Sequence, residues 1–268
     1  MLCFPNCKIN LGLNITSKRT DRFHDLETVF YPISLCDVLE IIQSDKFEFT
    51  STGLAIDGDV SNNLCTKAYH LLKKDFPNLP PVHIHLHKVI PMGAGLGGGS
   101  SDGAYMLTLL NNKFNLEINE EQLLRYALTL GSDCPFFIVN KPCLATGRGE
   151  VLKPVDVDLS NYKILLVNPN IHISTKEAFA GLAPKQPAKP IAEIIHQPII
   201  TWRDDLVNDF EANIFIQHPA VKLVKEGLYN LGALYASMTG TGSTVFGIFE
   251  KDQHPDLSVF KDHFHQWV

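Results

Sequence analysis

The sequence predicts an α+β fold divided into two domains. Its 268 residues correspond to one large domain or two modest ones, at roughly 100–200 residues per domain. A β-rich opening gives way to a region of mixed helix and strand patterns, and after Lys153-Pro154 a new strand begins at Lys163. We therefore place a domain junction at 154–162, with one domain over 1–155 and the second over 156–268.

The first domain opens with a strand. Residues 8–14 alternate, so that a period of two places Lys8 and Asn10 on one face and the isoleucine and leucines on the other. This pattern is typical of a half-buried strand. Further strands are expected at 38–49 and 82–90.

Three helices are predicted in the same domain. Apolar residues over 64–72 recur at helical spacing, and residues 101–112 are apolar nearly all round, which indicates a buried helix. Asn119, with Gln122 three residues later, forms a capping box for a helix over 120–130.

The second domain begins with a strand over 163–167. Prolines at 184–198 then mark a surface excursion within this domain rather than a linker, because helices are expected after it at about 205–216 and 219–231. A loop rich in glycine and hydroxyl side chains, 238–244, lies between two strand-like runs near the end of the chain.

Composition and charge exclude several classes of protein. A chain with 45% hydrophobic and 19% charged residues is globular rather than disordered or fibrous. The net charge of -6 gives no bulk positive field for nucleic acid or an anionic membrane. No apolar run reaches the roughly 18–20 residues that cross a bilayer, and the start has no signal core. Six cysteines without a CxxC indicate reduced thiols, so we expect a cytoplasmic protein.

The strongest local signal is a glycine-rich loop between a predicted strand and the predicted buried helix. It reads PMGAGLGGGSSD over 91–102. Glycines let backbone amides approach an anion closely, and the start of a helix adds the positive end of its dipole. The segment therefore predicts a phosphate-binding loop. Gly93, Gly95 and Gly98 also satisfy GxGxxG, but Pro91 interrupts the strand and no βαβ start precedes it; a Walker A lysine is absent.

A nucleotide bound without a P-loop lysine needs Mg²⁺ and cations from elsewhere in the chain. Lys8 and Lys88 are the candidates, with a solvated strand face as the alternative for Lys8. Asp133 places a carboxylate at the end of a helix and ahead of an apolar segment expected to be a strand; a plain turn aspartate is the alternative. The 238–244 loop is able to approach the first glycine loop.

Two clusters of polar side chains have competing interpretations. Residues 19–24 combine two guanidiniums, a phenyl ring and an imidazole, which suits an anionic aromatic ligand or a polar surface loop. His83, His85 and His87 share one face of a strand. Side chains on a flat strand point in parallel rather than converging on a metal, so a polar strand face is favoured.

These motifs, in this order, resemble the GHMP kinase superfamily, which combines a lysine-bearing strand, a PxxxGLGxxSS loop and a late glycine-rich motif. Within it, the chain resembles the family of 4-diphosphocytidyl-2-C-methyl-D-erythritol kinases. The matching segments are 8–11, 19–30, 95–102, 131–137, 208–211 and 239–243. The resemblance implies a two-domain fold with the active site in the inter-domain cleft. It also implies ATP-dependent phosphorylation of the 2-hydroxyl of the cytidyl substrate, in the non-mevalonate isoprenoid pathway.

The resemblance also implies roles for individual residues. Asp133 matches a catalytic aspartate that accepts the hydroxyl proton, and Lys8 matches its partner lysine. Ser101 is a candidate neighbour of Mg²⁺, whose ligands the sequence does not identify. The implied ATP-binding residues are Asn63, Leu64, Lys88, Pro91, Met92, Gly93, Ala94, Gly95, Leu96, Gly97, Gly98, Gly99, Ser100 and Ser101. The implied substrate-binding residues are Asn10, Phe23, His24, Asp133, Phe179 and Thr241.

The substrate loop departs from the pattern RPDGYH of the family. Thr20, Arg22 and Phe23 replace the proline, glycine and tyrosine. Phe23 loses a hydroxyl but keeps a ring that, with Phe179, would stack on cytosine. Arg22 either changes the turn or adds a cation toward the diphosphate.

Other functions are distinguishable in principle. A sister kinase acting on a mevalonate-type or homoserine-type alcohol needs no aromatic clamp, whereas Phe23, His24 and Phe179 provide one. A non-catalytic nucleotide-binding regulator would tolerate loss of Asp133. A dinucleotide oxidoreductase would bind NAD(P). We expect ATP and a small-molecule cytidyl substrate as the partners of a monomer or weak homodimer, with neither nucleic acid nor membrane among them.

Overall fold

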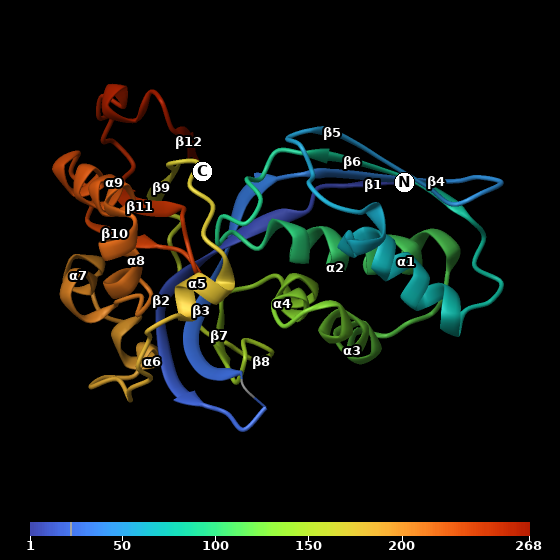
Figure 1. Cartoon of the computed structure of the whole chain (residues 1–268), viewed down its shortest axis with the longest axis horizontal. Coiled ribbons are helices and arrows are strands. Elements are labelled where there is room, and N and C mark those ends of the chain that lie inside the picture. The colour runs from blue at the N-terminus through green and yellow to red at the C-terminus, as the bar shows by residue number, and fades with distance from the viewer. Residues whose placement is uncertain (22) are drawn as a thin grey trace. The chain divides into compact units, whose positions relative to one another are not determined.

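A computed structural model describes residues 1–21 and 23–268 and confirms the predicted α+β fold (Figure 1). The chain forms two compact units. The first comprises 1–7, 32–92 and 97–140, and the second comprises 8–31, 93–96 and 141–268. The domain division predicted at residue 155 stays a proposal. Within the described part of the chain, no helix has the length and apolar character needed to cross a membrane.

The first unit contains a four-stranded sheet in the order β1-β4-β6-β5. These strands are β1 (Leu2–Cys3), β4 (Val38–Gln43), β6 (Val82–Lys88) and β5 (Glu48–Gly53). β4 pairs with β6 antiparallel and β5 pairs with β6 parallel. The single strand predicted over 38–49 is therefore wrong: it is two strands, separated by residues 44–47 with a bend at Asp45-Lys46, where Ser44 and Asp45 are residue types that favour turns.

Helices cover one face of this sheet (Figure 1). They are η1 (Val60–Asn62), α1 (Leu64–Asp75), α2 (Gly98–Phe114), α3 (Glu120–Leu130) and α4 (Cys134–Val139). The predicted capping box is confirmed, because Gln122 N donates to Asn119 Oδ1 and Asn119 N donates to Gln122 Oε1. Helix α2 is buried along most of its length, as its apolar sequence predicts.

The segment after Asp133 is a helix, so the strand expected there is wrong. Pro135 lies in the first turn of α4, where its fixed φ fits a helix and its missing N–H leaves no donor unpaired. Asn140 ends the helix in the left-handed conformation, with φ of 48°. A short apolar run does not distinguish a buried strand from a buried helix by periodicity, which explains the error.

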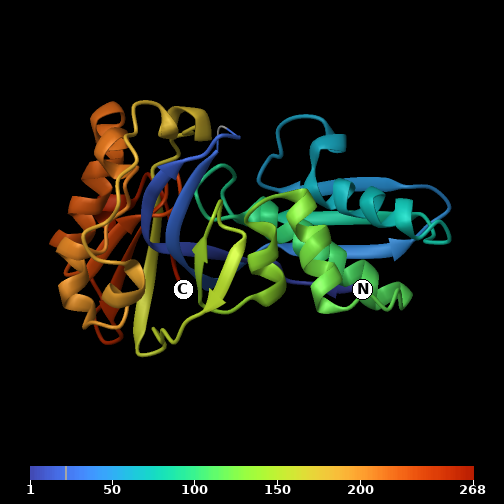
Figure 2. The ribbon, with the colours of Figure 1, turned by 90° about the horizontal axis from the view of Figure 1, so that it is seen from below.

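The second unit holds one complete sheet and most of another. The first sheet is antiparallel, in the order β10-β11-β9-β12. Its strands are β10 (Tyr235–Met238), β11 (Val245–Glu250), β9 (Tyr162–Asn168) and β12 (Phe264–Trp267). The other sheet has the order β2-β3-β7-β8, and Figure 2 shows the β7–β8 hairpin alongside β3. Its strands are β2 (Asn6–Lys18), β3 (His24–Cys36), β7 (Cys143–Thr146) and β8 (Val151–Pro154).

Short helices complete the second unit. They are α5 (Thr175–Phe179), α6 (Ile191–Ile194), η2 (Ile199–Thr201), α7 (Trp202–Asp205), α8 (Glu211–Gln217), α9 (Pro219–Asn230) and η3 (Ser258–Phe260). Side chains from α8 and α9, including Ile214, Val221 and Leu228, join a buried core with residues of β9, β10 and β11. This burial stabilises the amphipathic helices, which are too short to persist alone in water.

The helix predicted at 205–216 is interrupted. Helix α7 ends at Asp205 and α8 begins at Glu211, because residues 207–209 pair with β2 between them. Leu13 N donates to Val207 O at 2.8 Å, and Asp209 N donates to Leu13 O at 2.8 Å. A tertiary pairing has overridden the local helical pattern here.

Candidate active site

The glycine-rich loop runs from β6 into α2, as the sequence predicts. Helix α2 begins at Gly98, three residues before its predicted start, and Gly97 is its N-cap in the left-handed conformation with φ of 72°. An L side chain at Gly97 would be strained, so glycine is needed for this entry into the helix. The loop therefore delivers the chain to a buried helix N-terminus, whose unpaired amides favour an anion.

The tip of the loop contacts the second glycine-rich loop, which confirms that 238–244 approaches it. Thr239 Oγ1 lies 3.1 Å from Gly95 O, and Thr244 N donates to Ala94 O at 3.3 Å. A Cβ at Gly95 would lie 1.9 Å from Thr239 O, and φ there is +78°. Gly95 is required both by the close approach and by the backbone conformation. Thr241, on the same loop, is half-buried.

Lys8 lies buried beneath this contact. Its Nζ donates to Asn10 Oδ1 at 2.7 Å and to Gly95 O at 2.9 Å, and it lies 5.1 Å from the centre of the Phe30 ring. Asn10 N in turn donates to Thr239 Oγ1 at 3.1 Å. The structure thus places Lys8 and Asn10 at the tip of the glycine loop, which lies far from both residues in the sequence.

A cavity of about 270 Å³ in the first unit contains four of the predicted ATP-binding residues: Asn63, Leu64, Met92 and Gly99. The other lining residues are Phe49, Ser51, Ile56, Asp57, Gly58, Asp59, Val60 and Asn62. The segment 56–60 was not predicted as part of the site, and a turn-rich run ahead of a helix gives no distinctive signal. Asn63 caps α1 by accepting from Cys65 N at 2.8 Å, which fixes this edge of the cavity.

Lys88 has a different environment from these residues. Its ammonium is 2% exposed and forms ion pairs with Asp37 Oδ2 and, at 2.8 Å, with Asp102 Oδ2. Burial lowers the pKa of Lys88, but the two carboxylates outweigh this and leave the pKa above its usual value. Burial raises the pKa of Asp102 to about 7, with a further upward contribution from Asp37 opposed by Lys88. Asp102 ends the glycine-rich motif, but no pattern in the sequence selects Asp37 or predicts that both pair with Lys88.

Asp133 lies at the start of α4, half-buried, in the turn after α3. The next residue, Cys134, is buried, and burial raises the pKa of its thiol to about 12, opposed by a hydrogen bond with Ser100. The Asp133 turn therefore adjoins the first turn of α2, which carries Ser100 and Ser101. Ser101 Oγ is buried without a hydrogen-bond partner among the described residues.

The aromatic residues predicted to bind a base lie in two contacts. His24 stacks on Phe179 with ring centres 4.7 Å apart and an interplanar angle of 19°. Phe23 is 53% exposed, and the guanidinium of Arg148 lies 4.9 Å from its ring centre. Arg148, in the β7–β8 turn, was not predicted. Arg22 lies outside the described residues.

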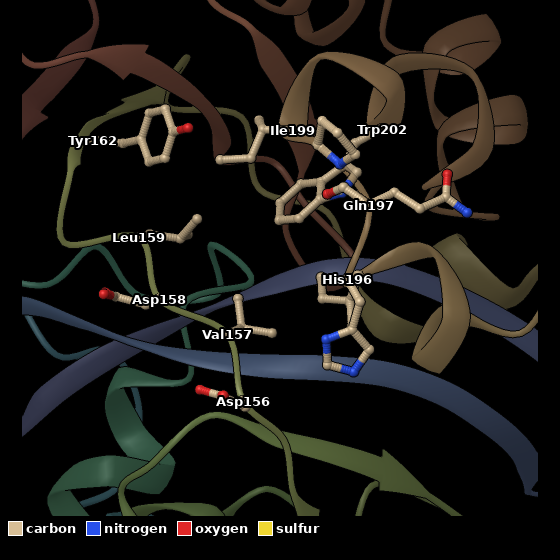
Figure 3. A pocket seen from close by; sticks show the side chains of 11 residues that line it. Asp156, Val157, Asp158, Leu159, Tyr162, His196, Gln197, Ile199 and Trp202 are labelled. Carbon is tan, nitrogen blue, oxygen red and sulfur yellow. The ribbon is translucent and has the colours of Figure 1, made fainter.

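Two other features contain no predicted site residue. The histidines of β6 form a hydrogen-bonded row with β5: Thr50 Oγ1 contacts His83 and His85, and Thr52 Oγ1 contacts His85 and His87, at 2.9–3.1 Å. This confirms the polar strand face. A second cavity of about 400 Å³ lies in the second unit between the 156–162 segment and Trp202, with Asp156 and His196 at its rim (Figure 3).

Comparisons with known proteins agree with this architecture. The chain matches the families described as GHMP kinases N terminal domain, over 63–141, and GHMP kinases C terminal, over 191–257. A solved mevalonate kinase shares the fold, with a TM-score of 0.69 at 14% identity over 100% of this chain and 98% of that one. The fold and the glycine-rich loop together define a small-molecule kinase of the GHMP class, which uses ATP as a substrate.

More similar relatives specify the family. A 4-diphosphocytidyl-2-C-methyl-D-erythritol kinase of Azobacteroides pseudotrichonymphae is 50% identical over 269 residues, covering 100% of both chains. The enzyme of that name from Bacteroides fragilis is 51% identical, covering 94% of this chain and 93% of its own. A crystal structure of 4-(cytidine 5'-diphospho)-2C-methyl-D-erythritol kinase aligns with a TM-score of 0.80 at 31% identity, over 92% of this chain and 90% of that one. The chain belongs to the 4-diphosphocytidyl-2-C-methyl-D-erythritol kinase family.

Proposed function

We propose that this protein transfers the γ-phosphoryl group of ATP to the 2-hydroxyl of 4-diphosphocytidyl-2-C-methyl-D-erythritol, a step in isoprenoid precursor synthesis. The observation that carries the proposal is the contact of the Lys8 ammonium with Gly95 O at the tip of the glycine loop. It fixes a buried cation beside the loop that holds phosphate, in a chain that has no P-loop lysine. Relatives at about 50% identity over the whole chain carry the corresponding name.

The phosphates of ATP would lie against residues 93–101. The amides at the start of α2 donate toward the phosphate oxygens, and the helix dipole adds a partial positive charge there. The adenosine would occupy the cavity lined by Asn63, Leu64 and Met92. Its volume of about 270 Å³ suits a purine with part of its ribose better than a whole nucleotide. The triphosphate therefore extends along the loop.

Asp133 is proposed to accept the proton of the attacking hydroxyl, and Lys8 to balance the charge that develops on the transferred group. A carboxylate suffices as the base, because loose phosphoryl transfer depends on positioning and charge stabilisation more than on basicity. Asn10 supports this role of Lys8 by accepting a hydrogen bond from its ammonium at 2.7 Å.

The residues at the start of α2 fit a hard cation such as Mg²⁺. Ser101 Oγ is a buried oxygen atom without a hydrogen-bond partner in the described part of the chain, and Mg²⁺ prefers oxygen ligands while keeping several waters. When bound, Mg²⁺ would neutralise charge on the phosphates. Asp133 would supply the proton acceptor. Lys8 and the loop amides would supply the remaining positive charge around the phosphates.

The cytidyl group is assigned to the aromatic residues of the second unit. His24, Phe179 and Phe23 offer ring faces for cytosine, and the guanidinium of Arg148 lies next to Phe23. An alcohol without a base would make no use of these rings. This favours the cytidyl substrate over mevalonate or homoserine.

The direct test is ADP release by the purified protein with ATP and Mg²⁺. The acceptor is 4-diphosphocytidyl-2-C-methyl-D-erythritol in one assay and mevalonate in the other. Each assay has a control reaction from which the acceptor alcohol is omitted. We expect turnover only with the cytidyl compound. Turnover with mevalonate alone would retain the kinase class and reject the substrate, and ADP release independent of any alcohol would reject the transfer reaction. We propose a cytoplasmic enzyme, monomeric or weakly dimeric, which sedimentation at several concentrations would check.

A further inference from the structure

Three charged side chains are buried together beside the phosphate loop, within the first unit. Lys88 is 2%, Asp37 0% and Asp102 3% exposed. Lys88 Nζ donates to both carboxylates, at 2.8 Å in the case of Asp102 Oδ2. None of the three lines the cavity assigned to adenosine. Buried ions lose their hydration, so the group persists only because each charge has close partners.

The contacts of this group reach both ends of the glycine loop. Asp37 Oδ1 accepts hydrogen bonds from Val89 N at 2.6 Å and Ile90 N at 2.9 Å, the last two amides before Pro91. Asp37 Oδ2 binds Lys88, and Lys88 binds Asp102 in the first turns of α2, just after the loop. A continuous path of charge-assisted hydrogen bonds therefore joins the residue before the loop to the residue after it. We call these three residues the clasp.

The clasp also lies directly against the helix start. A Cβ at Gly98 would lie 3.1 Å from Lys88 Nζ and 2.9 Å from Ile90 Cγ2. The ammonium and the first residue of α2 are thus in close contact, and only glycine fits without displacement. Hydrogen bonds of this charged type are shorter and more directional than neutral ones, so they hold the two ends of a glycine-rich segment in one arrangement.

We propose that Asp102, through Lys88 and Asp37, is a positioning residue that closes the ends of the phosphate loop and presets its amides for the triphosphate. The proposal rests on the proposed assignment of ATP to this loop. A glycine-rich segment samples many backbone conformations, and ordering it on binding weakens affinity. With its ends fixed, the loop loses less freedom when the nucleotide binds.

The test compares three variants in the full-length protein. Asp102→Asn keeps the shape and one oxygen acceptor for Lys88 but removes a charge. Asp102→Glu restores the charge on a longer arm. Leu110→Ala is the control, because Leu110 is fully buried in the same helix, about two turns beyond Asp102. Measurements are the melting temperature, the equilibrium dissociation constant of ATP·Mg²⁺, and kcat and KM for each substrate.

We expect Asp102→Asn to weaken ATP binding about tenfold or more, because a loop whose ends are no longer fixed must be ordered when the nucleotide binds. KM for the alcohol should stay within about twofold, and Asp102→Glu should recover part of the ATP affinity. Leu110→Ala should lower the melting temperature without changing the ATP dissociation constant. The proposal is overturned if Asp102→Asn binds ATP as the wild type does, or if Leu110→Ala weakens ATP binding equally.

A further variant covers the case in which Asp102→Asn does not fold. Asp37→Asn retains acceptance from the Val89 and Ile90 amides by its carbonyl oxygen and should show the same selective loss of ATP affinity. Unaltered affinity in that variant would also reject the clasp.

Measurement of the ATP dissociation constant requires no acceptor alcohol, so it is independent of the proposed substrate. A wild-type protein that binds ATP but phosphorylates no cytidyl substrate would therefore refute the proposed function and leave the clasp testable.

Discussion

His24 and Phe179 stack face to face, with ring centres 4.7 Å apart and planes inclined by 19°. Phe210 packs against Phe179 in a T-shaped arrangement, with ring centres 4.8 Å apart. In this arrangement His24 covers one face of Phe179, so a base either displaces the imidazole from that face or stacks elsewhere on the pair. Either way, the pair forms one aromatic platform in the second unit.

Replacing Phe179 by leucine should raise KM for the cytidyl substrate, because it removes the platform that supports the base. Stacking of a base on an aromatic side chain contributes about 1–3 kcal/mol, which corresponds to roughly 5- to 150-fold in KM. KM for ATP should remain unchanged. The matched control is Phe47→Leu, since Phe47 stacks on Tyr69 at the same 4.7 Å separation but belongs to no proposed site. Equal effects of the two variants on the cytidyl KM would argue against the assignment.

Asp133→Asn should keep nucleotide affinity and lose most turnover. The substitution removes the proton acceptor without changing the glycine loop, and general-base catalysis contributes about 10²- to 10⁴-fold. Equilibrium binding of ATP and the rate of ADP release distinguish the two effects. Ser132→Ala, at the neighbouring position, serves as the control and should retain turnover. Wild-type rates in Asp133→Asn would remove Asp133 from the reaction.

The two glycines Gly95 and Gly99 should respond very differently to alanine. A Cβ at Gly95 would lie 1.9 Å from Thr239 O with φ at +78°, whereas a Cβ at Gly99 meets nothing within 4 Å. Gly95→Ala must therefore shift the loop tip away from Thr239, and should lower kcat/KM for ATP by about 10²-fold. Gly99→Ala should lose far less. Steady-state kinetics at varied ATP would check this, and similar losses in both variants would contradict the close approach of Gly95 to Thr239.

Stability should depend on pH through Asp102. Its folded pKa is raised to about 7, while an unfolded aspartate has a pKa of about 3.9. Between these values the native chain binds a proton that the unfolded chain has released, so this group's contribution to the free energy of unfolding falls as pH rises. The difference in that free energy between wild type and Asp102→Asn should therefore decline as pH rises from about 4 to 7. Urea titrations at each pH measure it; a pH-independent difference would exclude a raised pKa.

Asn119→Ala should lower stability without altering catalysis. The substitution removes the acceptor for Gln122 N at the start of α3, a capping hydrogen bond of 2.9 Å. Loss of such a cap typically costs about 0.5–2 kcal/mol of unfolding free energy. Denaturant unfolding gives the change, and unchanged kcat and KM would show that the site is unaffected. If Asn119→Ala has the same free energy of unfolding as the wild type, the capping box contributes little to stability.

Periodicity and capping determine much of the local structure in this chain. The α3 bounds follow from Asn119 and Gln122, and β6 and β9 follow from apolar patterning, since these signals lie within a few residues. The order of the glycine and lysine motifs was enough to identify the kinase class. Errors arose where a short apolar run had no periodicity, as at 134–139, or where pairing with β2 interrupted a predicted helix at 206–210.

The sequence by itself determined the kinase class, the phosphate loop and the candidate residues Lys8 and Asp133. Only the tertiary structure decided what Lys88 does, because its partners Asp37 and Asp102 are far apart in the chain and no pattern in the sequence pairs them with each other or with Lys88. A charge that ends up buried must find a partner wherever the fold supplies one. Arg148 was also found only in the structure: the β7–β8 turn places its guanidinium over Phe23, and no motif in the sequence marks it.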